Sequence, residues 1–142
     1  MTNINSLNCK LEELEIRHIS SFPSKYSKDK EVATSVNFKF GFTSFEESHL
    51  GIILRVIVAQ NNDTLMGVEL FGAFEIEKND WKKMIVDDKL IIPSRLAQFM
   101  LSTAYDSARG VFLHKNMKNE LHKINIPLLK AERLIKKDVI FE

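Results

Sequence analysis

The chain has 142 residues, of which 44% are hydrophobic and 27% charged, and a formal net charge of +1. A chain of this length and ordinary composition is predicted to fold as a single domain over residues 1–142 with a core of its own. The near-neutral charge gives no electrostatic reason to expect binding to nucleic acid or to an anionic membrane surface.

Targeting and redox signals both favour the cytoplasm. The first ten residues lack the basic and then apolar pattern of a signal peptide, and no run approaches the ~20 apolar residues of a transmembrane helix. The single cysteine, Cys9, allows no disulfide within the chain, as is typical of a reducing compartment. We therefore expect a cytoplasmic protein that does not insert into membranes.

The N-terminal part predicts a disordered end and two strands. Residues 1–9 are mostly polar and are expected to be disordered. Residues 10–22 are compatible with a helix or a strand, and the alternation around Leu14 and Ile16 favours a strand. Residues 23–31 form a polar linker long enough for a crossover loop rather than a tight hairpin. A strand is then predicted within residues 34–45, with an apolar face made of Val36, Phe38, Phe40 and Phe42.

Residues 50–77 predict a β-hairpin, because two runs of alternating apolar residues flank Asn61-Asn62-Asp63. A three-residue loop gathers the even-numbered apolar residues of both strands on one face, whereas a two-residue loop scatters them over both faces. We therefore predict the three-residue loop, which also places Arg55 opposite Glu69. The paired residues are then Val58 with Met66, Val56 with Val68, Leu54 with Leu70, Ile52 with Gly72 and Leu50 with Phe74.

The rest of the chain has helical spacing. A short helix is predicted around Trp81 and Met84, followed by a polar turn at Asp87-Asp88. Pro93 opens the clearest helix, which is predicted to end at Arg109 and Gly110 because both are C-terminal signals.

A connecting stretch with some extended backbone is expected over residues 111–125, and a final helix of about ten residues is expected from Pro127. Strands followed by helices predict the α+β class. We expect a four-stranded antiparallel meander sheet with two or three C-terminal helices packed on the even-numbered face. The opposite, odd-numbered face has mixed character and is a candidate for self-association.

No constellation of catalytic or metal-binding residues is visible. The histidines do not stand in a short ligand spacing with Cys, Asp or Glu, and Cys9 has no basic partner. There is no G-x-S-x-G elbow and no phosphate-binding glycine loop. Asp87 and Asp88 are adjacent and are interpreted as a turn rather than an acid–base pair. We therefore expect no enzymatic activity, no metal and no cofactor, and binding as the function.

A series of short motifs runs in order between residues 50 and 135. Its members are Leu54-Arg55-Val56, Gly72-Ala73-Phe74-Glu75-Ile76, Ile91-Ile92-Pro93, Arg109-Gly110-Val111-Phe112 and Ile126-Pro127. This series resembles the SecB family of export chaperones. The resemblance implies a four-stranded antiparallel sheet with helices on one face and a tetramer built as a dimer of dimers. It also implies ATP-independent holding of unfolded polypeptides in apolar grooves and delivery to the motor SecA, while some relatives protect an antitoxin.

The sequence departs from that family in its charge and at one position of the sheet. The family's best-known members are strongly acidic, whereas this chain has a pI of about 7.8. An acidic position that those members use to dock SecA falls at Gly67 here, and Glu69 shares that face. These departures weigh against SecA docking more than against client holding, because client holding depends on distributed apolar surface.

Two sets of site residues follow from this interpretation. Aromatic residues are expected to line a client-binding groove, although each could equally belong to the core. The groove residues are Phe40, Phe42, Phe45, Trp81 and Phe112. A subunit interface is expected on the odd-numbered face, at Ile53, Arg55, Glu69 and Phe71.

Three functions remain open at this point. The leading one is an oligomeric holdase that binds unfolded or precursor polypeptides without ATP. The second is a dedicated partner-binding module of the same fold, serving one toxin–antitoxin or phage-encoded protein. The third is a small-molecule binder or enzyme hidden between sheet and helices, against which the missing polar constellation argues.

Overall fold

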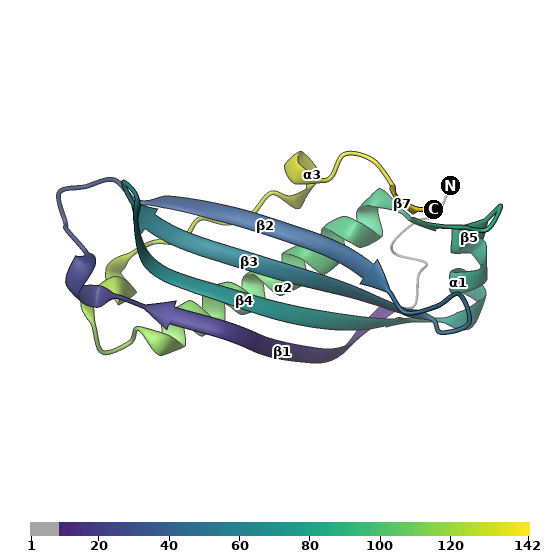
Figure 1. Cartoon of the computed structure of the whole chain (residues 1–142), viewed down its shortest axis with the longest axis horizontal. Helices are drawn as coiled ribbons and strands as arrows, with labels where there is room; N and C mark the ends of the chain where they lie inside the picture. Colours follow the sequence, from purple (N-terminus) through teal and green to yellow (C-terminus); the bar gives the residue numbers. More distant parts are fainter. Residues whose placement is uncertain (1–8) are drawn as a thin grey trace.

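The computed structural model describes residues 9–142 and contains one long antiparallel sheet with one long helix behind it (Figure 1). The prediction of disorder covers residues 1–9. Of these, residues 1–8 lie outside the described part of the chain, and Cys9 is the first residue of a strand. The strands of the large sheet are β1 (Cys9–Ser21), β2 (Ala33–Phe42), β3 (His49–Gln60) and β4 (Asp63–Ile76). The helices are α1 (Lys78–Met84), α2 (Ser94–Lys115) and α3 (Ala131–Leu134), with 3₁₀ turns η2 (Pro23–Lys25) and η3 (Glu120–Lys123).

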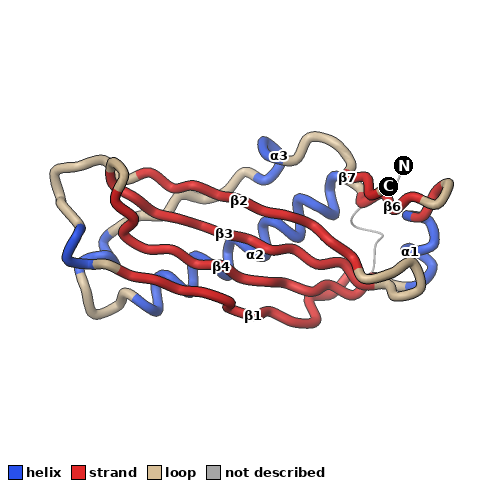
Figure 2. The backbone as a smooth tube through the Cα atoms, in the orientation of Figure 1, coloured by secondary structure: helices blue, strands red, loops and turns tan. Residues whose placement is uncertain are grey.

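The α+β class and the four antiparallel strands are confirmed, but the meander order is wrong for one strand. Strands β2, β3 and β4 are neighbours in chain order, whereas β1 pairs with β4, so that the order is β1-β4-β3-β2. The linker between β1 and β2 therefore crosses one end of the sheet, as its length suggested (Figure 2). Strand β1 has 13 residues and β4 has 14, so the pairing satisfies the backbone groups of β4 along almost its whole length.

Strand β1 is irregular, which explains its ambiguous sequence. Its pairing with β4 shifts between Leu11 and Glu13 and again between Ile16 and His18, so Glu12 and Arg17 are the extra residues of two β-bulges. Successive apolar residues of β1 are separated alternately by two and by three positions, and each bulge accommodates one of the three-residue spacings. As a result, its less polar side chains all face the side of α2: Cys9, Leu11, Leu14, Ile16, Ile19 and Ser21.

The hairpin of β3 and β4 has the predicted register, including Leu54 opposite Leu70 and Arg55 opposite Glu69. The predicted loop length is wrong, because Gln60 pairs with Asp63 and the turn has two residues. A bulge at Leu65 adds the third residue and restores the phase. A two-residue turn and a one-residue bulge thus have the same effect on side-chain orientation as a three-residue loop.

Helix α2 continues to Lys115, so its predicted end at Arg109 and Gly110 is wrong, as is the extended backbone predicted just after them. Gly110 does not adopt a positive φ, and the buried Phe112 continues the apolar face of the helix. Burying a phenylalanine contributes about 1.5–3 kcal/mol, which outweighs the ~1 kcal/mol cost of a glycine inside a helix. Asn116 caps the end of the helix, and its side-chain amide donates to the carbonyl of Phe112 at 2.9 Å.

The expected final helix of about ten residues from Pro127 is also wrong, because only the four residues of α3 are helical. The chain there runs extended beside α2, on the side of β2 (Figure 1). The hydroxyl of Tyr105 donates to the carbonyl of Pro127 at 2.7 Å, and the Gln98 amide donates to the carbonyl of Ile135 at 2.8 Å. These tertiary hydrogen bonds occupy backbone carbonyls and outweigh the local helical preference.

A second, small sheet closes one end of the molecule and was not predicted. It has the order β5-β6-β7 and consists of β5 (Ile85–Val86), β6 (Lys89–Ile92) and β7 (Val139–Phe141). Asp87 and Asp88 form the turn between β5 and β6, both with positive φ, at 51° and 61°. Two such residues are the geometry of a two-residue β-hairpin turn, so the expected turn at Asp87-Asp88 is confirmed.

The core lies between the large sheet and α2, which packs mainly on β3 and β4. Alanines at positions 97, 104 and 108 allow the helix to lie close to the strands. The sheet contributes Leu50, Ile52, Leu54, Val56, Val58, Met66, Val68, Leu70, Phe74 and Ile76, all buried.

One buried polar side chain, Gln60, attaches the crossover linker to the hairpin. Its Oε1 accepts the N–H of Ser27 at 2.9 Å, and its Nε2 donates to the carbonyls of Ser27 at 2.6 Å and Lys30 at 3.0 Å. The three hydrogen bonds fix the linker where it passes from one edge of the sheet to the other.

Replacing Gln60 with methionine keeps the volume but removes all three hydrogen bonds. We expect the free energy of unfolding to fall by about 1–3 kcal/mol, because backbone groups of the linker lose their partners. We also expect faster trypsin cleavage at Lys25, Lys28 and Lys30. Urea denaturation and timed proteolysis measure the two effects. The control Asn62→Ala in the exposed turn should change the free energy of unfolding by less than ~0.5 kcal/mol. A Gln60→Met protein as stable as wild type and as resistant to trypsin would contradict the role of Gln60 in attaching the linker.

Candidate functional site

Four aromatic rings gather at the end of the molecule where β2 ends and α1 begins. The Phe42 ring lies 5.4 Å from the Phe45 ring, 6.4 Å from Trp81 and 5.2 Å from Phe141, measured between ring centroids. The Trp81 indole donates to the carbonyl of Phe45 at 2.7 Å, which fixes the loop after β2 on α1. We call Phe42, Phe45, Trp81 and Phe141 the aromatic cluster. Phe45 is 38% exposed, so the cluster reaches the surface there.

The structure brings four of the five predicted groove residues to this end. Phe40 precedes Phe42 on the same strand and is buried, with its ring 5.7 Å from that of Phe38. Phe112 is separate from them, near the far end of α2. It lines a different cavity of about 500 Å³, together with Leu113, Leu121 and Ile126. The five residues therefore do not form one continuous groove.

A second apolar surface, missed by sequence reasoning, lies between β1 and α2. Leu11, Leu14 and Ile16 face the side of α2 but are 40%, 40% and 50% exposed, because the helix packs on β3 and β4 instead. Phe99 of α2 is 43% exposed, and its ring lies 6.3 Å from that of Phe74, the partner of Leu11 in the sheet. We call Leu11, Leu14, Ile16 and Phe99 the β1–α2 strip.

The strip is bordered by an open strand edge. Among the described residues, no strand pairs with the outer edge of β1. Exposed apolar side chains beside free backbone groups are the combination that an added strand can use. This surface could have been predicted only from the position of β1 in the sheet. The apolar pattern of β1 does not determine that position.

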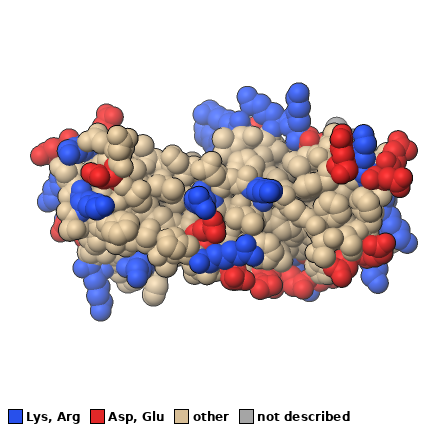
Figure 3. All heavy atoms as spheres, viewed as in Figure 1, with Lys and Arg blue, Asp and Glu red and all other residues tan. Residues whose placement is uncertain are grey.

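The predicted interface residues meet on the opposite face of the sheet. Ile53 is directly opposite Phe71, and Arg55 Nη2 lies 2.8 Å from Glu69 Oε1. The Arg17 guanidinium lies over the Phe71 ring at 4.7 Å. Figure 3 views this face, which is largely uncharged, with a few charged side chains near its middle and many around its rim.

The same face is hollowed by a cavity of about 470 Å³. Its floor is a row of small residues, Gly41, Gly51 and Ala73, which are neighbours across β2, β3 and β4. Gly51 lies under the Phe71 ring, and a Cβ there would be 2.9 Å from Phe71 Cε1, so only glycine fits without a shift. The hollow combines an apolar wall with a polar rim.

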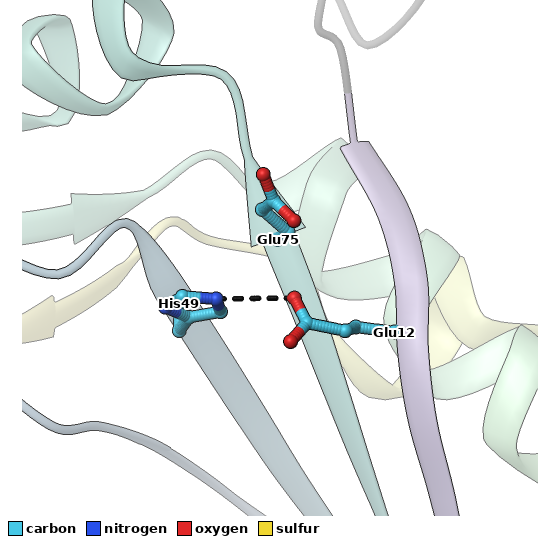
Figure 4. A group of neighbouring side chains, drawn as sticks. All are labelled: Glu12, His49 and Glu75. Atoms are coloured by element: carbon cyan, nitrogen blue, oxygen red, sulfur yellow. Dashed lines mark hydrogen bonds and ion pairs between the residues drawn. The ribbon is translucent and has the colours of Figure 1, made fainter.

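Two residues that line the hollow, Glu12 and His49, form a group of potential metal ligands with Glu75 beside it. His49 Nε2 lies 3.1 Å from Glu12 Oε2, and one ligand atom each of Glu12, His49 and Glu75 lie within 4.8 Å of one another (Figure 4). These residues come from β1, β3 and β4, far apart in sequence. The signal that could have found them is the hairpin register, because Leu50 opposite Phe74 places His49 opposite Glu75.

Cys9 lies at the start of β1 and packs against the core. Burial raises the pKa of its thiol to about 11. The thiolate is the nucleophilic form, so this thiol is suppressed as a reactive group at neutral pH.

Comparisons with known proteins identify the fold. No protein-family model matches the chain, and no curated protein matches it in sequence. Among solved structures, it matches the Mycobacterium tuberculosis SecB-like chaperone Rv1957, in complex with a ChAD peptide from the Rv1956 HigA1 antitoxin. The TM-score is 0.60 at 8% sequence identity, over 86% of this chain and 88% of that chain. The fold is SecB-like.

The resemblance drawn from the motif series is therefore confirmed for the fold. At 8% identity the likeness does not extend to particular side chains, so the binding surfaces are interpreted from this chain alone. No helix in residues 9–142 is both long and apolar enough to cross a membrane.

The pKa of Cys9 predicts its rate of alkylation. Raising a thiol pKa from 9.0 to about 11 lowers the thiolate fraction at pH 8 by about a hundredfold. We expect iodoacetamide to modify the native protein at least ~10-fold more slowly than the protein in guanidinium chloride, as measured by mass spectrometry. The native rate should still rise between pH 9 and 10, where the unfolded rate levels off. The variant Cys9→Ser is the control without a thiol. Equal alkylation rates for the native and the unfolded protein would show that the thiol is not suppressed.

Proposed function

We propose that this protein is an ATP-independent holdase that binds unfolded polypeptide segments through exposed apolar surface. The observation that carries the proposal is the β1–α2 strip, in which four large apolar side chains remain exposed beside an open strand edge. The SecB-like fold supports it, because Rv1957 is a chaperone of that fold in complex with a peptide.

The strip has the chemistry that an extended client segment needs. Apolar client side chains that cover Leu11, Leu14, Ile16 and Phe99 remove apolar area from water, at about 25 cal/mol per Å². The free edge of β1 can add backbone hydrogen bonds by β-augmentation. These terms depend on the backbone and on apolarity rather than on one sequence, which suits a holdase of broad specificity.

The aromatic cluster supplies a second contact point at one end of the molecule. In this proposal Phe42 and Phe45 touch the client, while the buried Phe40 and Trp81 hold them in position. Phe112 lines the separate cavity near the end of α2, a helix of 22 residues and so about 33 Å long. Contacts spread over such a distance strengthen the binding of a long chain through effective concentration.

Oligomerisation would multiply these sites, and we propose the outer sheet face as the subunit interface of a dimer of dimers. Ile53 and Phe71 are partly exposed apolar neighbours there, and the Arg55–Glu69 pair beside them is already neutralised. A face with few unpaired charges at its centre and many at its rim resembles the composition of protein interfaces.

Export through SecA is not part of the leading proposal. The carboxylate of Glu69, the acidic residue on the face that the family uses for SecA, is bound by Arg55 at 2.8 Å. Gly67 has no side chain to replace it. We propose that clients are held in the cytoplasm, and the proposal assigns no delivery step.

The alternative is a dedicated module for one partner, such as a toxin–antitoxin or phage-encoded protein. The observation that favours it is the solved complex of Rv1957 with an antitoxin peptide. The same strip and strand edge would then select one sequence through side-chain pockets rather than accept many.

Aggregation of a chemically unfolded reporter protein, followed by light scattering without ATP, tests the general holdase. We expect suppression near stoichiometric amounts. The double variant Leu14→Thr with Ile16→Thr should at least halve the suppression, because it removes apolar contact while keeping strand propensity. Phe45→Ser tests the aromatic cluster in the same assay.

The control is Leu128→Thr, which removes an apolar side chain that is even more exposed but lies away from the strip. Circular dichroism and thermal unfolding establish that each variant is folded. Folded wild-type protein that leaves aggregation unchanged would refute the general holdase. Tight one-to-one binding of a protein encoded by a neighbouring gene would then establish the dedicated module.

The interface proposal predicts the solution mass. We expect the wild-type protein to be a dimer or tetramer by light scattering coupled to size exclusion, and Ile53→Lys to reduce that mass, because a buried unpaired ammonium disfavours association. Thermal unfolding of the dilute Ile53→Lys protein shows whether it is folded, and Leu128→Lys controls for the added lysine. Together they separate dissociation from misfolding. A monomeric wild type, or an unchanged mass for Ile53→Lys, would exclude this face as the interface.

A further inference from the structure

Three side chains with the donor atoms of a metal site converge on the outer face of the sheet (Figure 4), and two of them, Glu12 and His49, line the hollow. From their geometry we propose that Glu12, His49 and Glu75 bind one divalent ion of the zinc type, with an open coordination position toward the hollow. The site does not depend on client holding.

The distances are close to those of a ligand set. Zinc bonds of about 2.0–2.2 Å to histidine nitrogen and carboxylate oxygen place tetrahedral ligand atoms about 3.3–3.6 Å apart. His49 Nε2 and Glu12 Oε2 are already 3.1 Å apart, and the ligand atoms of all three residues lie within 4.8 Å. Rotation of the exposed glutamate side chains closes the remaining gap without backbone movement.

The fold builds this convergence from strand register and side-chain alternation. His49 and Glu75 are directly opposite each other in β3 and β4. Regular alternation after Leu11 points Glu12 to the outer face, and because Glu12 is the extra residue of a bulge, Glu13 lies on that face too, so both line the outer hollow. The side chain that the bulge re-aims is that of Glu13, which adds a second carboxylate to the hollow beside Glu12.

Neither carboxylate is occupied by a lysine or arginine. The ion pair that Glu12 makes within residues 9–142 is with His49, which is itself a ligand of the proposed site. In the same part of the chain Glu75 makes no ion pair or hydrogen bond through its side chain, although Lys10 is its neighbour by register. A divalent cation would therefore offset the repulsion between two nearby carboxylates without displacing a strong partner.

The donor set selects the class of ion. One imidazole nitrogen and two carboxylate oxygens suit zinc and its first-row neighbours such as cobalt, whereas Ca²⁺ and Mg²⁺ take six or more oxygen ligands. Cys9 is excluded as a fourth ligand, because it faces the side of α2 and packs against the core. The hollow beside Glu12 and His49, lined also by Gly41 and Gly51, leaves room for water as a fourth ligand.

A bound ion would connect three strands at one point. It would attach the edge strand β1 to β3 across β4, next to a bulge where the backbone ladder is interrupted. Because the ligands converge only in the folded chain, binding would stabilise the fold.

The test uses the full chain carrying Cys9→Ser, which removes competing thiol chemistry, after treatment with a chelator. Calorimetric titration with zinc chloride should give one ion per chain, and cobalt should produce the visible absorption of a low-symmetry site. His49→Ala, Glu12→Gln and Glu75→Gln should each weaken zinc binding by more than about tenfold. Zinc should raise the thermal midpoint of the parent protein but not that of His49→Ala.

The matched controls are His18→Ala and Glu15→Gln, which change the same residue types on the outer side of β1 outside the trio, and they should bind zinc like the parent. The two glutamates are exposed and His49 is partly exposed, so circular dichroism should show native folding in every variant. Absence of saturable one-to-one binding would overturn the proposal. So would equal affinity in the parent and in all three trio variants, which would indicate an adventitious ion only, held by His114 or His122.

Discussion

The register between β3 and β4 is the constraint on which the rest of the structure depends. It places Leu54 opposite Leu70 and its even-numbered neighbours under α2, and by the same alternation it fixes the odd-numbered face. The Arg55–Glu69 pair, the contact of Ile53 with Phe71 and the approach of His49 to Glu75 all follow from that one choice. A slip by one residue would move charged side chains under the helix, so burial of the core also specifies the outer face.

The width of a single helix explains why apolar surface remains exposed. A helix is about 10–12 Å across with its side chains, and strands are about 4.8 Å apart, so α2 covers two of the four strands. The extended segment after η3 runs on the side of β2 (Figure 1). Among the described residues, α2 leaves the middle of β1 uncovered, and Leu11, Leu14 and Ile16 therefore stay exposed although they face the core side.

Local patterns predicted the hairpin, the Phe-rich strand and the start of α2, because there the apolar period, the turn residues and Pro93 all agree. They failed where a distant contact decides, as at Gly110, which burial of Phe112 keeps helical, and after Pro127, where α2 side chains bind the backbone. Three members of the aromatic cluster, Phe42, Phe45 and Trp81, were among the predicted groove residues, but Phe141 was not, because the small sheet that brings it to Phe42 was not predicted. The metal-ligand trio was missed because its members are neighbours only across strands.

Strand β1 carries opposite chemistry on its two faces. Its two bulges keep apolar residues toward α2 while Glu12 and Glu13 line the outer hollow. An ion held by Glu12 would restrain the same stretch of backbone that presents Leu11 and Leu14 to a client. Restraining an edge strand in its bound conformation lowers the ordering cost of binding, so the outer site would strengthen capture on the inner face without touching the client.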